Sequence, residues 1–389
     1  MKKFIALALA LVMILALGAC SSKPAATETD IPATNAPEKP AETTGLKIAI
    51  VTSPSGVDDG SFNQDCYDGA LAFVKNHPEA TVTPVQEQDI ANSVNAVSDI
   101  VADYDVIVTP GFQFGGITTL AQENPDKMFI LIDAWPAGED GMDLPEDEPV
   151  SNIYAVYYAE QESGFFAGIA AAMETKTNKV AVVNGIAYPS NVNYQYGFEA
   201  GVAYANAKLG TAVECVEIAA YAGTDVLNNN VGGNYIGDFN DPATGKVVGK
   251  ALIDQGVDIM FVAAGNSGNG VFTAAKEAKD VYVIGCDVDQ YDDGVNGDKN
   301  IVLTSGLKNM AYTVETALEA VAGGSFKGAN VRLTAATNGT GFVSEEGRHQ
   351  LSEATLAACT EAYEAVKGGT IVPPSNFSET TVENFVGLK

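Results

Sequence analysis

Residues 56–63 read Gly-Val-Asp-Asp-Gly-Ser-Phe-Asn and separate two apolar patterns. Before them, residues 48–51 form a short apolar run that predicts a buried strand. After them, apolar side chains recur at helical spacing and predict a helix over 63–76. The octapeptide is therefore a polar, glycine-containing turn between a strand and a helix. In an open α/β sheet such a turn lies at the carboxyl end of a strand, where ligands bind.

The turn concentrates side chains that suit a polar ligand with a flat ring. Asp58 and Asp59 can accept hydrogen bonds from sugar hydroxyls, and Phe62 can stack on a ring. Asn63 can both donate and accept. The alternative is structural: an aspartate or serine that caps the helix, beside a phenylalanine that packs in the core. The turn alone does not decide between the two interpretations.

The charge of the chain excludes several classes of partner. Its 389 residues carry a formal net charge of −29 at pH 7. Nucleic acid and anionic membrane surfaces would be repelled, so neither is expected as a direct partner. The two histidines, His77 and His349, are too few for a histidine-rich metal site. A hydrophobic content of 46% is enough for the cores of two or three domains.

The first twenty residues resemble the signal peptide of a bacterial lipoprotein. Two lysines precede an apolar stretch, residues 5–17, that is too short for a comfortable membrane span. It ends in Leu-Gly-Ala-Cys at 17–20, which is similar to a lipobox. We therefore expect removal of residues 1–19, lipidation of Cys20 and a disordered tether over 20–45. This would anchor the protein to the cell membrane on its extracytoplasmic side; an ordinary signal peptide is the alternative.

Four cysteines follow Cys20, and none has Cys-x-x-Cys spacing: Cys66, Cys215, Cys286 and Cys359. A chain of this length does not need disulfides to stabilise its core. Four mostly buried thiols are therefore expected, with one bridge left open.

The body of the chain alternates strand and helix patterns, which predicts an α/β fold with right-handed crossovers. The strand-like runs are rich in Val and Ile with little polar alternation, as in parallel strands buried on both faces. Strands are expected at 47–52, 81–85, 105–109, 128–133, 152–157, 179–183, 213–218, 258–264, 281–286 and 301–304. Helices are expected at 63–76, 91–103, 116–123, 160–174, 194–209, 243–256, 269–279, 308–321 and 349–366. Ten strands are many for one sheet, so two sheets are expected.

Polar or glycine residues follow several of these strands directly. The carboxyl ends of parallel strands meet at one edge of a sheet, so such residues come together in space. Because they belong to two candidate sheets, they predict a cleft between two lobes. The residues are Asp58, Asp59, Asp133, Gly265, Asp287 and Lys308.

Neither acidic segment of the chain predicts a calcium site. In the run 287–298, Tyr291 occupies a ligand position of the best EF-hand register, and Asn300 stands where the bidentate glutamate belongs. The run 140–149 is better explained as a solvated surface loop. No metal and no cofactor is therefore expected.

Six motifs resemble, in chain order, those of the basic membrane protein family of lipoproteins. Members are substrate-binding proteins of ABC importers and include purine nucleoside receptors. The motifs are DDGSFN at 58–63, GFEAG at 197–201, DP with GK at 241–246, a glycine loop at 265–271, GCDVDQ at 285–290 and LTS with a lysine at 303–308. The resemblance covers residues 46–389. Segments 186–194 and 225–236 are less like the family, which leaves the shape of those loops open.

The resemblance implies a type I periplasmic-binding-protein fold, in which two α/β lobes hold the ligand between them. Three crossings of the chain would join the lobes, near 157–159, 288–292 and 325–335. The N-terminal lobe would comprise 46–157 and 290–328, and the C-terminal lobe 158–289 and 329–389.

The resemblance also implies roles for eight ligand-binding residues. Phe62 and Phe198 would sandwich a base, and Asn63 and Asp133 would hydrogen-bond its edges. Asp58, Gly265, Asp287 and Lys308 would hold the ribose, while Asp59 would brace the turn.

From the residues alone, simpler interpretations of these positions stay open. Phe198 on an amphipathic helix would pack in the core, and Asp133 and Asp287 would cap helices. Lys308 would be an exposed lysine at a helix start. Trp135 would line the mouth of the cleft or lie at the surface.

The expected function is capture of a nucleoside, with a purine favoured, for delivery to an ABC permease and its ATPase. The carboxylates should repel a phosphate, so nucleosides should bind better than nucleotides, and Lys308 would offset the buried negative charge. An enzyme is not expected, because the carboxylates are dispersed over separate strand ends. A monomer is expected. The alternatives are a receptor for a sugar or other small polar metabolite, and a surface lipoprotein with a host-binding role.

Overall fold

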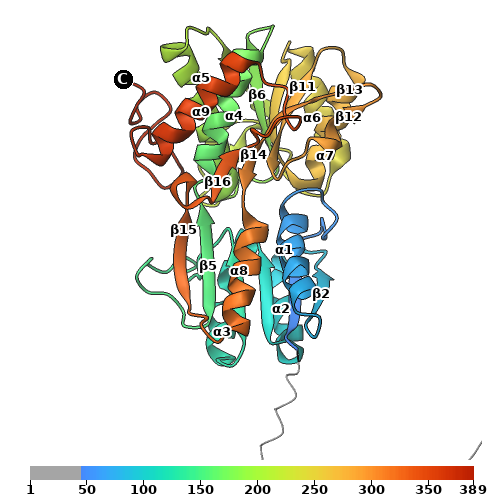
Figure 1. The fold of residues 1–389 in the computed structure, drawn as a ribbon, viewed down its shortest axis with the longest axis vertical. Helices are drawn as coiled ribbons and strands as arrows, with labels where there is room; N and C mark the ends of the chain where they lie inside the picture. The colour runs from blue at the N-terminus through green and yellow to red at the C-terminus, as the bar shows by residue number, and fades with distance from the viewer. Residues whose placement is uncertain (1–44) are drawn as a thin grey trace, which may run out of the picture. The chain divides into compact units, whose positions relative to one another are not determined.

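Two six-stranded sheets with helices on both faces make up residues 45–389, the part of the chain that the structure describes (Figure 1). The structure is a computed structural model. The expected α/β class with two sheets is confirmed. The predicted signal peptide, Cys20 and the tether up to residue 44 lie outside the described residues. Over residues 45–389, no helix has the length and apolar character that a membrane span requires.

The first sheet is built from six parallel strands. They are β1 (Lys47–Thr52), β2 (Thr81–Gln86), β3 (Val106–Pro110), β4 (Met128–Ile132), β5 (Ile153–Tyr158) and β15 (Ala329–Leu333), in the order β15-β5-β4-β3-β1-β2. Alternate residues face two cores: Val106 and Val108 contact one helix layer and Ile107 the other. Helices α1 (Phe62–Asn76) and α8 (Met310–Ala322) cover the first face. Helices α2 (Ser93–Ile100) and α3 (Thr118–Glu123) cover the second.

The second sheet has five parallel strands and one antiparallel edge strand, β16. Its strands are β6 (Lys179–Asn184), β7 (Glu214–Cys215), β10 (Ile259–Ala263), β11 (Tyr282–Asp287), β14 (Val302–Lys308) and β16 (Thr340–Phe342), in the order β16-β14-β11-β10-β6-β7. Helices α4 (Glu160–Glu174), α5 (Pro189–Lys208) and α9 (Glu353–Lys367) cover one face. Helices α6 (Pro242–Asp254) and α7 (Gly265–Glu277) cover the other. Two short hairpins lie outside the sheets: β8 (Gly223–Thr224) with β9 (Asn230–Gly232), and β12 (Val295–Asn296) with β13 (Lys299–Asn300).

Three connections join the first sheet and its helices, the N-terminal lobe, to the second, the C-terminal lobe. The chain passes between lobes from β5 to α4, from β14 to α8 and after β15 (Figure 1). The predicted second crossing near 288–292 is wrong, because β14 pairs with β11 and β16 in the second sheet and the chain crosses only after Lys308. The predicted lobe boundary at 328–329 is also wrong, because β15 pairs with β5 in the first sheet.

The extra length of β14 explains the error at the second crossing. The sequence Thr-Ser-Gly at 304–306 suggests the end of a strand, but buried hydrogen bonds satisfy its hydroxyl groups. Thr304 Oγ1 donates to Val343 O at 2.7 Å, and Ser305 Oγ accepts from the Gln290 backbone at 3.1 Å. The strand therefore continues to Lys308, which ends it instead of starting the next helix.

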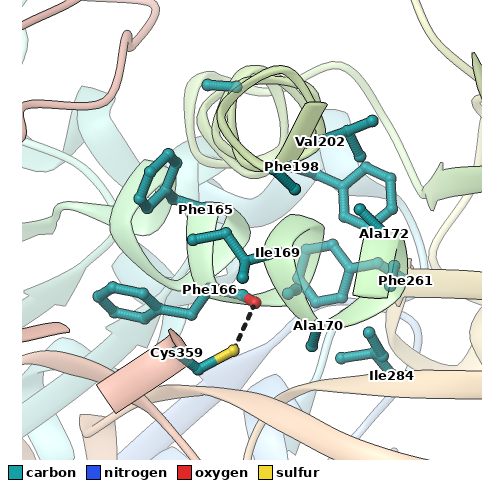
Figure 2. Packing of buried hydrophobic residues seen from close by; sticks show 14 of the residues in the cluster. Phe165, Phe166, Ile169, Ala170, Ala172, Phe198, Val202, Phe261, Ile284 and Cys359 are labelled. Carbon is teal, nitrogen blue, oxygen red and sulfur yellow. Dashed lines mark hydrogen bonds between the residues drawn. The ribbon is translucent and has the colours of Figure 1, made fainter. Parts of the chain in front are cut away.

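Glycines let α4 and α5 pack at very short separation. A Cβ atom at Gly168 or Gly201 would overlap backbone atoms of the facing helix, at Phe198 and Phe165 respectively. Phe198 therefore points away from the helix contact and into a core with Phe261 and Val202 (Figure 2). The GFEAG motif thus has a structural explanation, the close contact of two helices.

The four cysteines of the described residues are free thiols, and three of them are buried. The Cys359 Sγ donates to Phe166 O at 3.7 Å inside the same core (Figure 2). This confirms the expected mostly buried thiols.

Substitution of Gly201 by alanine should destabilise the protein. Alanine favours a helix intrinsically, but here its methyl group would overlap the α4 backbone, so overpacking by roughly 1–3 kcal/mol is expected to dominate. Urea unfolding of wild type and Gly201→Ala measures the loss. Gly116→Ala is the control, because Gly116 is exposed and a Cβ there would make only an ordinary contact. Equal stability of Gly201→Ala and wild type would contradict the packing argument.

Candidate ligand-binding site

A pocket lies between the lobes, at the carboxyl ends of strands from both sheets. The N-terminal lobe contributes the turn after β1, the segment after β3 and Asp133 after β4. The C-terminal lobe contributes the start of α5, Phe239, Gly265, Asp287 and Lys308. The cavity has a volume of about 60 Å³. Side chains that are far apart in the sequence thus face one small space.

Asp59 braces the turn between β1 and α1. Its carboxylate accepts hydrogen bonds from the backbone N–H groups of Ser61, Asn63 and Gln64 at 3.0–3.1 Å. Burial raises the pKa of Asp59, and these N–H groups oppose the shift. Asp58 is exposed and does not line the pocket. The structure therefore does not bring Asp58 to the predicted ribose site.

Phe62 and Asn63 both line the pocket from the first turn of α1. The Phe62 ring lies 4.8 Å from the Lys308 Nζ atom, within the range of a cation–π contact. Asn63 donates from Nδ2 to Ser53 Oγ at 3.1 Å. Its Oδ1 atom is buried and has no hydrogen-bond partner among the described residues, so it can accept from a ligand.

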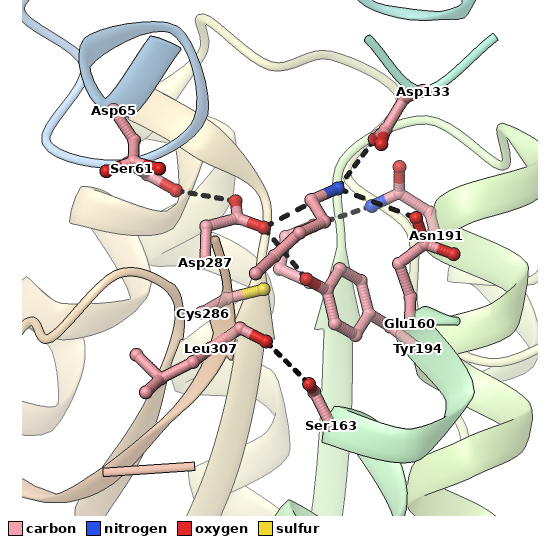
Figure 3. Close-up of polar contacts among 12 residues, drawn as sticks. Ser61, Asp65, Asp133, Glu160, Ser163, Asn191, Tyr194, Cys286, Asp287 and Leu307 are labelled. Carbon is pink, nitrogen blue, oxygen red and sulfur yellow. Dashed lines mark hydrogen bonds and ion pairs between the residues drawn. The ribbon is translucent and has the colours of Figure 1, made fainter. Parts of the chain in front are cut away.

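One ammonium group and three carboxylates form the charged centre of the site (Figure 3). The Lys308 Nζ atom lies 2.6 Å from Asp133 Oδ2 and 3.7 Å from both Glu160 Oε1 and Asp287 Oδ1. Lys308 is 2% exposed and Glu160 is fully buried. Asp133, Asp287 and Lys308 line the pocket, whereas Glu160 lies behind them. Lys308 is therefore a buried counter-ion and not an exposed lysine at a helix start.

Burial and mutual repulsion set the ionisation of this cluster. Burial raises the pKa of Asp133, and Lys308 opposes the shift. Burial and then the charge of Asp133 raise the pKa of Glu160 to about 7, with Lys308 again opposing. Burial lowers the pKa of Lys308, but the surrounding carboxylates outweigh it, so that pKa ends above its ordinary value. The ammonium thus stays charged at pH 7, where the Glu160 carboxyl group is protonated part of the time.

Asp133 and Asp287 have left-handed backbone conformations at the ends of their strands. Asp133 has φ of 60° and Asp287 has φ of 70°, values that aspartate tolerates better than most residues. Asp287 accepts from Tyr194 OH at 2.8 Å and from Ser61 Oγ at 2.9 Å, so it joins the two lobes. The Oδ1 atom of Asp133 is buried without a hydrogen-bond partner among the described residues. Strained backbone of this kind is common at functional sites.

Phe198 does not reach the pocket, so its predicted role in a base sandwich is wrong. Its side chain is fully buried and stacks on Phe261 with ring centroids 5.8 Å apart and an interplanar angle of 15°. One helical turn earlier, Tyr194 lines the pocket. The helix α5 begins at Pro189, five residues before the predicted start, and this first part of the helix carries the pocket residues.

Aromatic rings from both lobes face the pocket in place of Phe198. They are Phe62 and Phe112 from the N-terminal lobe and Tyr188, Tyr194 and Phe239 from the C-terminal lobe. The Tyr188 ring lies 5.3 Å from Phe112 and 5.8 Å from Phe239, between centroids. Tyr188 belongs to the segment 186–194, one of the two that are less like the family, so the motifs could not identify it. Phe112 comes shortly after β3, and Phe239 lies in the loop before α6. A single aromatic residue at such a position does not by itself predict a binding site.

The sequence is similar to a family of known proteins over most of its length. The family model described as "ABC transporter substrate-binding protein PnrA-like" matches residues 46–220 and 219–364. The chain belongs to the Bmp family of substrate-binding proteins. A CD4+ T-cell-stimulating antigen of Listeria monocytogenes is 28% identical over 346 residues, which span 84% of this chain and 87% of that protein. An ABC transporter nucleoside-binding protein, BmpA, of Lactococcus lactis is 28% identical over 350 residues, 85% of this chain and 90% of that one.

Solved structures support the fold of this Bmp-family protein. A solute-binding protein of an ABC transporter system from Aeropyrum pernix superimposes with a TM-score of 0.70 at 23% identity, over 86% of this chain and 94% of that one. A second, from Conexibacter woesei, gives 0.60 at 20% identity, over 86% of this chain and all of that one. The type I periplasmic-binding-protein fold is therefore confirmed.

Two further predicted positions are placed by the structure. Gly265 lines the pocket with φ of 51° and begins α7, four residues before the predicted helix start. Trp135 is 8% exposed and does not line the pocket. Its ring packs 5.3 Å from Tyr157 and contacts the Arg332 guanidinium at 5.4 Å, so it belongs to the core of the N-terminal lobe.

Removal of the buried ammonium should destabilise this Bmp-family protein in a pH-dependent way. Lys308→Met leaves the three carboxylates without their counter-ion, a loss of roughly 3–5 kcal/mol for a broken buried pair. The pKa values of Asp133 and Glu160, which burial already raises in the folded state, would rise further because Lys308 no longer opposes the shift. The folded variant is then favoured at low pH, and its stability falls as the pH rises through those raised values. Thermal unfolding at pH 5 and pH 8 measures the effect.

The matched control is Lys246→Met, which removes a partly exposed lysine 2.6 Å from Glu277. It should change the melting temperature little, because exposed ion pairs contribute little to stability. Equal losses in the two variants, or a Lys308→Met variant that is most stable at pH 8, would contradict the role of Lys308 as a buried counter-ion.

Proposed function

We propose that this protein binds a purine nucleoside in the pocket between its lobes and delivers it to an ABC permease. The observation that carries the proposal is the combination in one pocket of aromatic rings from both lobes with a carboxylate–ammonium cluster. The name of the Lactococcus relative, a nucleoside-binding protein, supports the same ligand class.

The aromatic side suits a base. Phe62 stands on one lobe and Tyr188 and Phe239 on the other, so a flat ring entering the pocket meets π-faces from both. Stacking alone does not distinguish one purine from another. Two buried acceptor atoms without hydrogen-bond partners, Asn63 Oδ1 and Asp133 Oδ1, can accept hydrogen bonds from the edge of the base.

The charged side suits a ribose and disfavours a phosphate. Vicinal hydroxyl groups donate well to carboxylates, and Asp287 with Lys308 offers both an acceptor and a donor beside the pocket. Three carboxylates around one ammonium leave net negative charge. A nucleotide phosphate would be repelled by this excess.

The ligand would enter through movement of the lobes. The cavity of about 60 Å³ is smaller than the roughly 300–1,000 Å³ of typical ligand pockets. Hydrogen bonds cross its mouth, from Ser61 Oγ to Asp287 at 2.9 Å and from Ser55 Oγ to Phe239 O at 3.0 Å. Separation of the lobes would break these bonds and widen the pocket.

The remaining parts of the proposal follow the family. Its members are substrate-binding proteins, so we propose a binding role without catalysis and a partner permease with its ATPase. Attachment to the extracytoplasmic face of the membrane would be through lipidated Cys20, and the body would act as a monomer. A receptor for a sugar is the second candidate, because aromatic rings also stack on sugar faces.

Binding of adenosine should exceed that of its fragments and of its phosphate ester. Isothermal calorimetry with adenosine, ribose, 2′,3′-dideoxyadenosine and adenosine monophosphate measures the order. Adenosine has a base for the aromatic side of the pocket and ribose hydroxyl groups for the charged side. Ribose lacks the base, 2′,3′-dideoxyadenosine lacks two of the hydroxyl groups, and adenosine monophosphate carries a phosphate that the carboxylates repel. At a hundred-fold excess over Kd it should also stabilise the protein by about 2.7 kcal/mol.

Phe62→Ala should weaken adenosine and guanosine alike by roughly 1–3 kcal/mol, the range for base–aromatic stacking. Phe377→Ala is the control, because Phe377 is 44% exposed and does not line the pocket. Tighter binding of ribose or of other sugars than of adenosine would instead favour the sugar receptor. A melting temperature that no nucleoside raises would reject the ligand class.

Lipid attachment depends on the thiol at residue 20. Cys20→Ala should leave the precursor unprocessed or unlipidated, because Cys20 is the residue that ends the lipobox-like motif. Detergent phase partitioning should place the wild type in the detergent phase and detect a changed distribution of the variant. Identical partitioning of the two proteins would contradict the anchor.

A further inference from the structure

The fully buried carboxyl group of Glu160 lies behind the pocket and takes no part in the ligand contacts proposed above. Glu160 is the first residue of α4, directly after the first crossing between lobes. Its exposed fraction is zero, and it does not line the pocket. A buried carboxyl group without a role in packing is costly, so its presence calls for an explanation.

The two oxygens of Glu160 are in different surroundings. Oε2 accepts from Asn193 Nδ2 at 2.9 Å. Asn193 is itself oriented by the Asn376 backbone N–H, which donates to its Oδ1 at 2.8 Å. Oε1 lies 3.7 Å from the Lys308 Nζ atom and has no hydrogen-bond partner among the described residues. The oxygen that faces the ammonium thus makes an ion pair at 3.7 Å but no hydrogen bond.

The backbones that carry Glu160 and Lys308 are tied together. Ser163 Oγ, one turn along α4, donates to Leu307 O at 2.7 Å, next to Lys308 in β14 (Figure 3). This bond sets the backbone of Lys308 beside the start of α4. The ammonium lies between Glu160, which does not line the pocket, and Asp133 and Asp287, which do.

We propose that Glu160 is a positioning residue for the ligand site, and that it takes up a proton when a neutral ligand fills the pocket. The inference rests on the proposed function. A ligand that displaces water from Asp133 and Asp287 makes the net negative charge of the cluster more costly. A proton on Glu160 removes one of three carboxylate charges and frees the ammonium to face the pocket. Ligand affinity should then decrease as the pH rises.

Other titratable groups surround Glu160. Asp133 lies across Lys308 from it, and Asp287 contacts the same ammonium. Burial raises the pKa of the neighbouring tyrosines, Tyr157 and Tyr194, so both stay protonated near neutral pH. Two groups compete with Glu160 as the group that titrates. Burial raises the pKa of Asp133, which contacts the same ammonium, so pH dependence that survives in Glu160→Gln would be assigned to Asp133. Burial also raises the pKa of Asp65 on α1 to about 7, but Asp65 accepts from the Ala311 backbone N–H and does not contact Lys308.

The experiment measures adenosine affinity between pH 6 and pH 8 for the wild type, Glu160→Gln and Asp65→Asn. If binding raises the pKa of Glu160 by one pH unit from about 7, affinity should fall about five-fold from pH 6 to pH 8. Calorimetry of the wild type at pH 7 in buffers of different ionisation enthalpy should show proton uptake. Both signals should vanish in Glu160→Gln and persist in the matched control Asp65→Asn.

Three outcomes would overturn the inference. The first is a wild-type affinity that does not change with pH, and the second is pH dependence that survives in Glu160→Gln. The third is pH dependence lost in Asp65→Asn alone. The melting temperature without ligand gives a separate check: raising the pH through 7 should destabilise the wild type more than Glu160→Gln, because the raised pKa of Glu160 favours its protonated form in the fold. Failure of adenosine to bind at any pH would instead reject the nucleoside assignment on which the inference rests.

Discussion

The ammonium of Lys308 lies where carboxylates from three separate segments converge, and the arrangement of the pocket depends on this buried contact. Asp133 follows a strand of the N-terminal lobe, while Glu160 and Asp287 belong to the C-terminal lobe. Lys308 itself ends β14, immediately before the chain crosses back. A charge buried to this degree requires partners, so each of these elements must end at the right place. Because the buried ammonium of Lys308 needs carboxylate partners, the strands of both sheets that end at this cluster must have the lengths that bring those partners to it.

The sequence predicts the strand-end residues well because they are local consequences of chain order. An apolar run followed by Asp133, Asp287 or the turn at 56–63 places polar groups at the carboxyl edge of a parallel sheet, whatever the rest of the fold does. The predictions fail where helical rotation or strand length decides. Tyr194 and Phe198 are one helical turn apart on α5, yet the tyrosine lines the pocket and the phenylalanine packs in the core. Nothing local in the sequence separates those two positions.

The failure at Phe198 also shows what a motif can mean. Gly197 and Gly201 allow α5 to approach the α4 backbone, and this approach places Phe198 against Phe261. The motif that resembles the family thus preserves a helix contact and not a ligand contact. A similar distinction applies at the turn after β1, where Asp59 binds backbone N–H groups and the adjacent Asp58 is exposed. Adjacent residues of one motif thus have different roles, because Asp59 is buried in the turn and Asp58 is exposed.

The hydrogen bonds across the pocket mouth determine how strongly a bound ligand can change the separation of the lobes. Ser61 to Asp287 and Gln290 to the Gly60 carbonyl, at 2.9 Å and 3.2 Å, join the lobes. Each such bond exchanges with water when the lobes part, so its net contribution is about 0.5–1.5 kcal/mol for the neutral bond from Gln290 and about 1.5–3 kcal/mol for the bond to the Asp287 carboxylate. With only a few such bonds, the free-energy difference between the joined and the separated lobes is small. A ligand can therefore shift the equilibrium between these two states by a modest difference in its affinity for them. Asp287 is the residue where the two effects meet, since the same carboxylate that accepts from Ser61 across the lobes also lines the pocket. A ligand hydroxyl that binds Asp287 therefore competes with or reinforces a bond between the lobes, which links occupancy of the pocket directly to their separation.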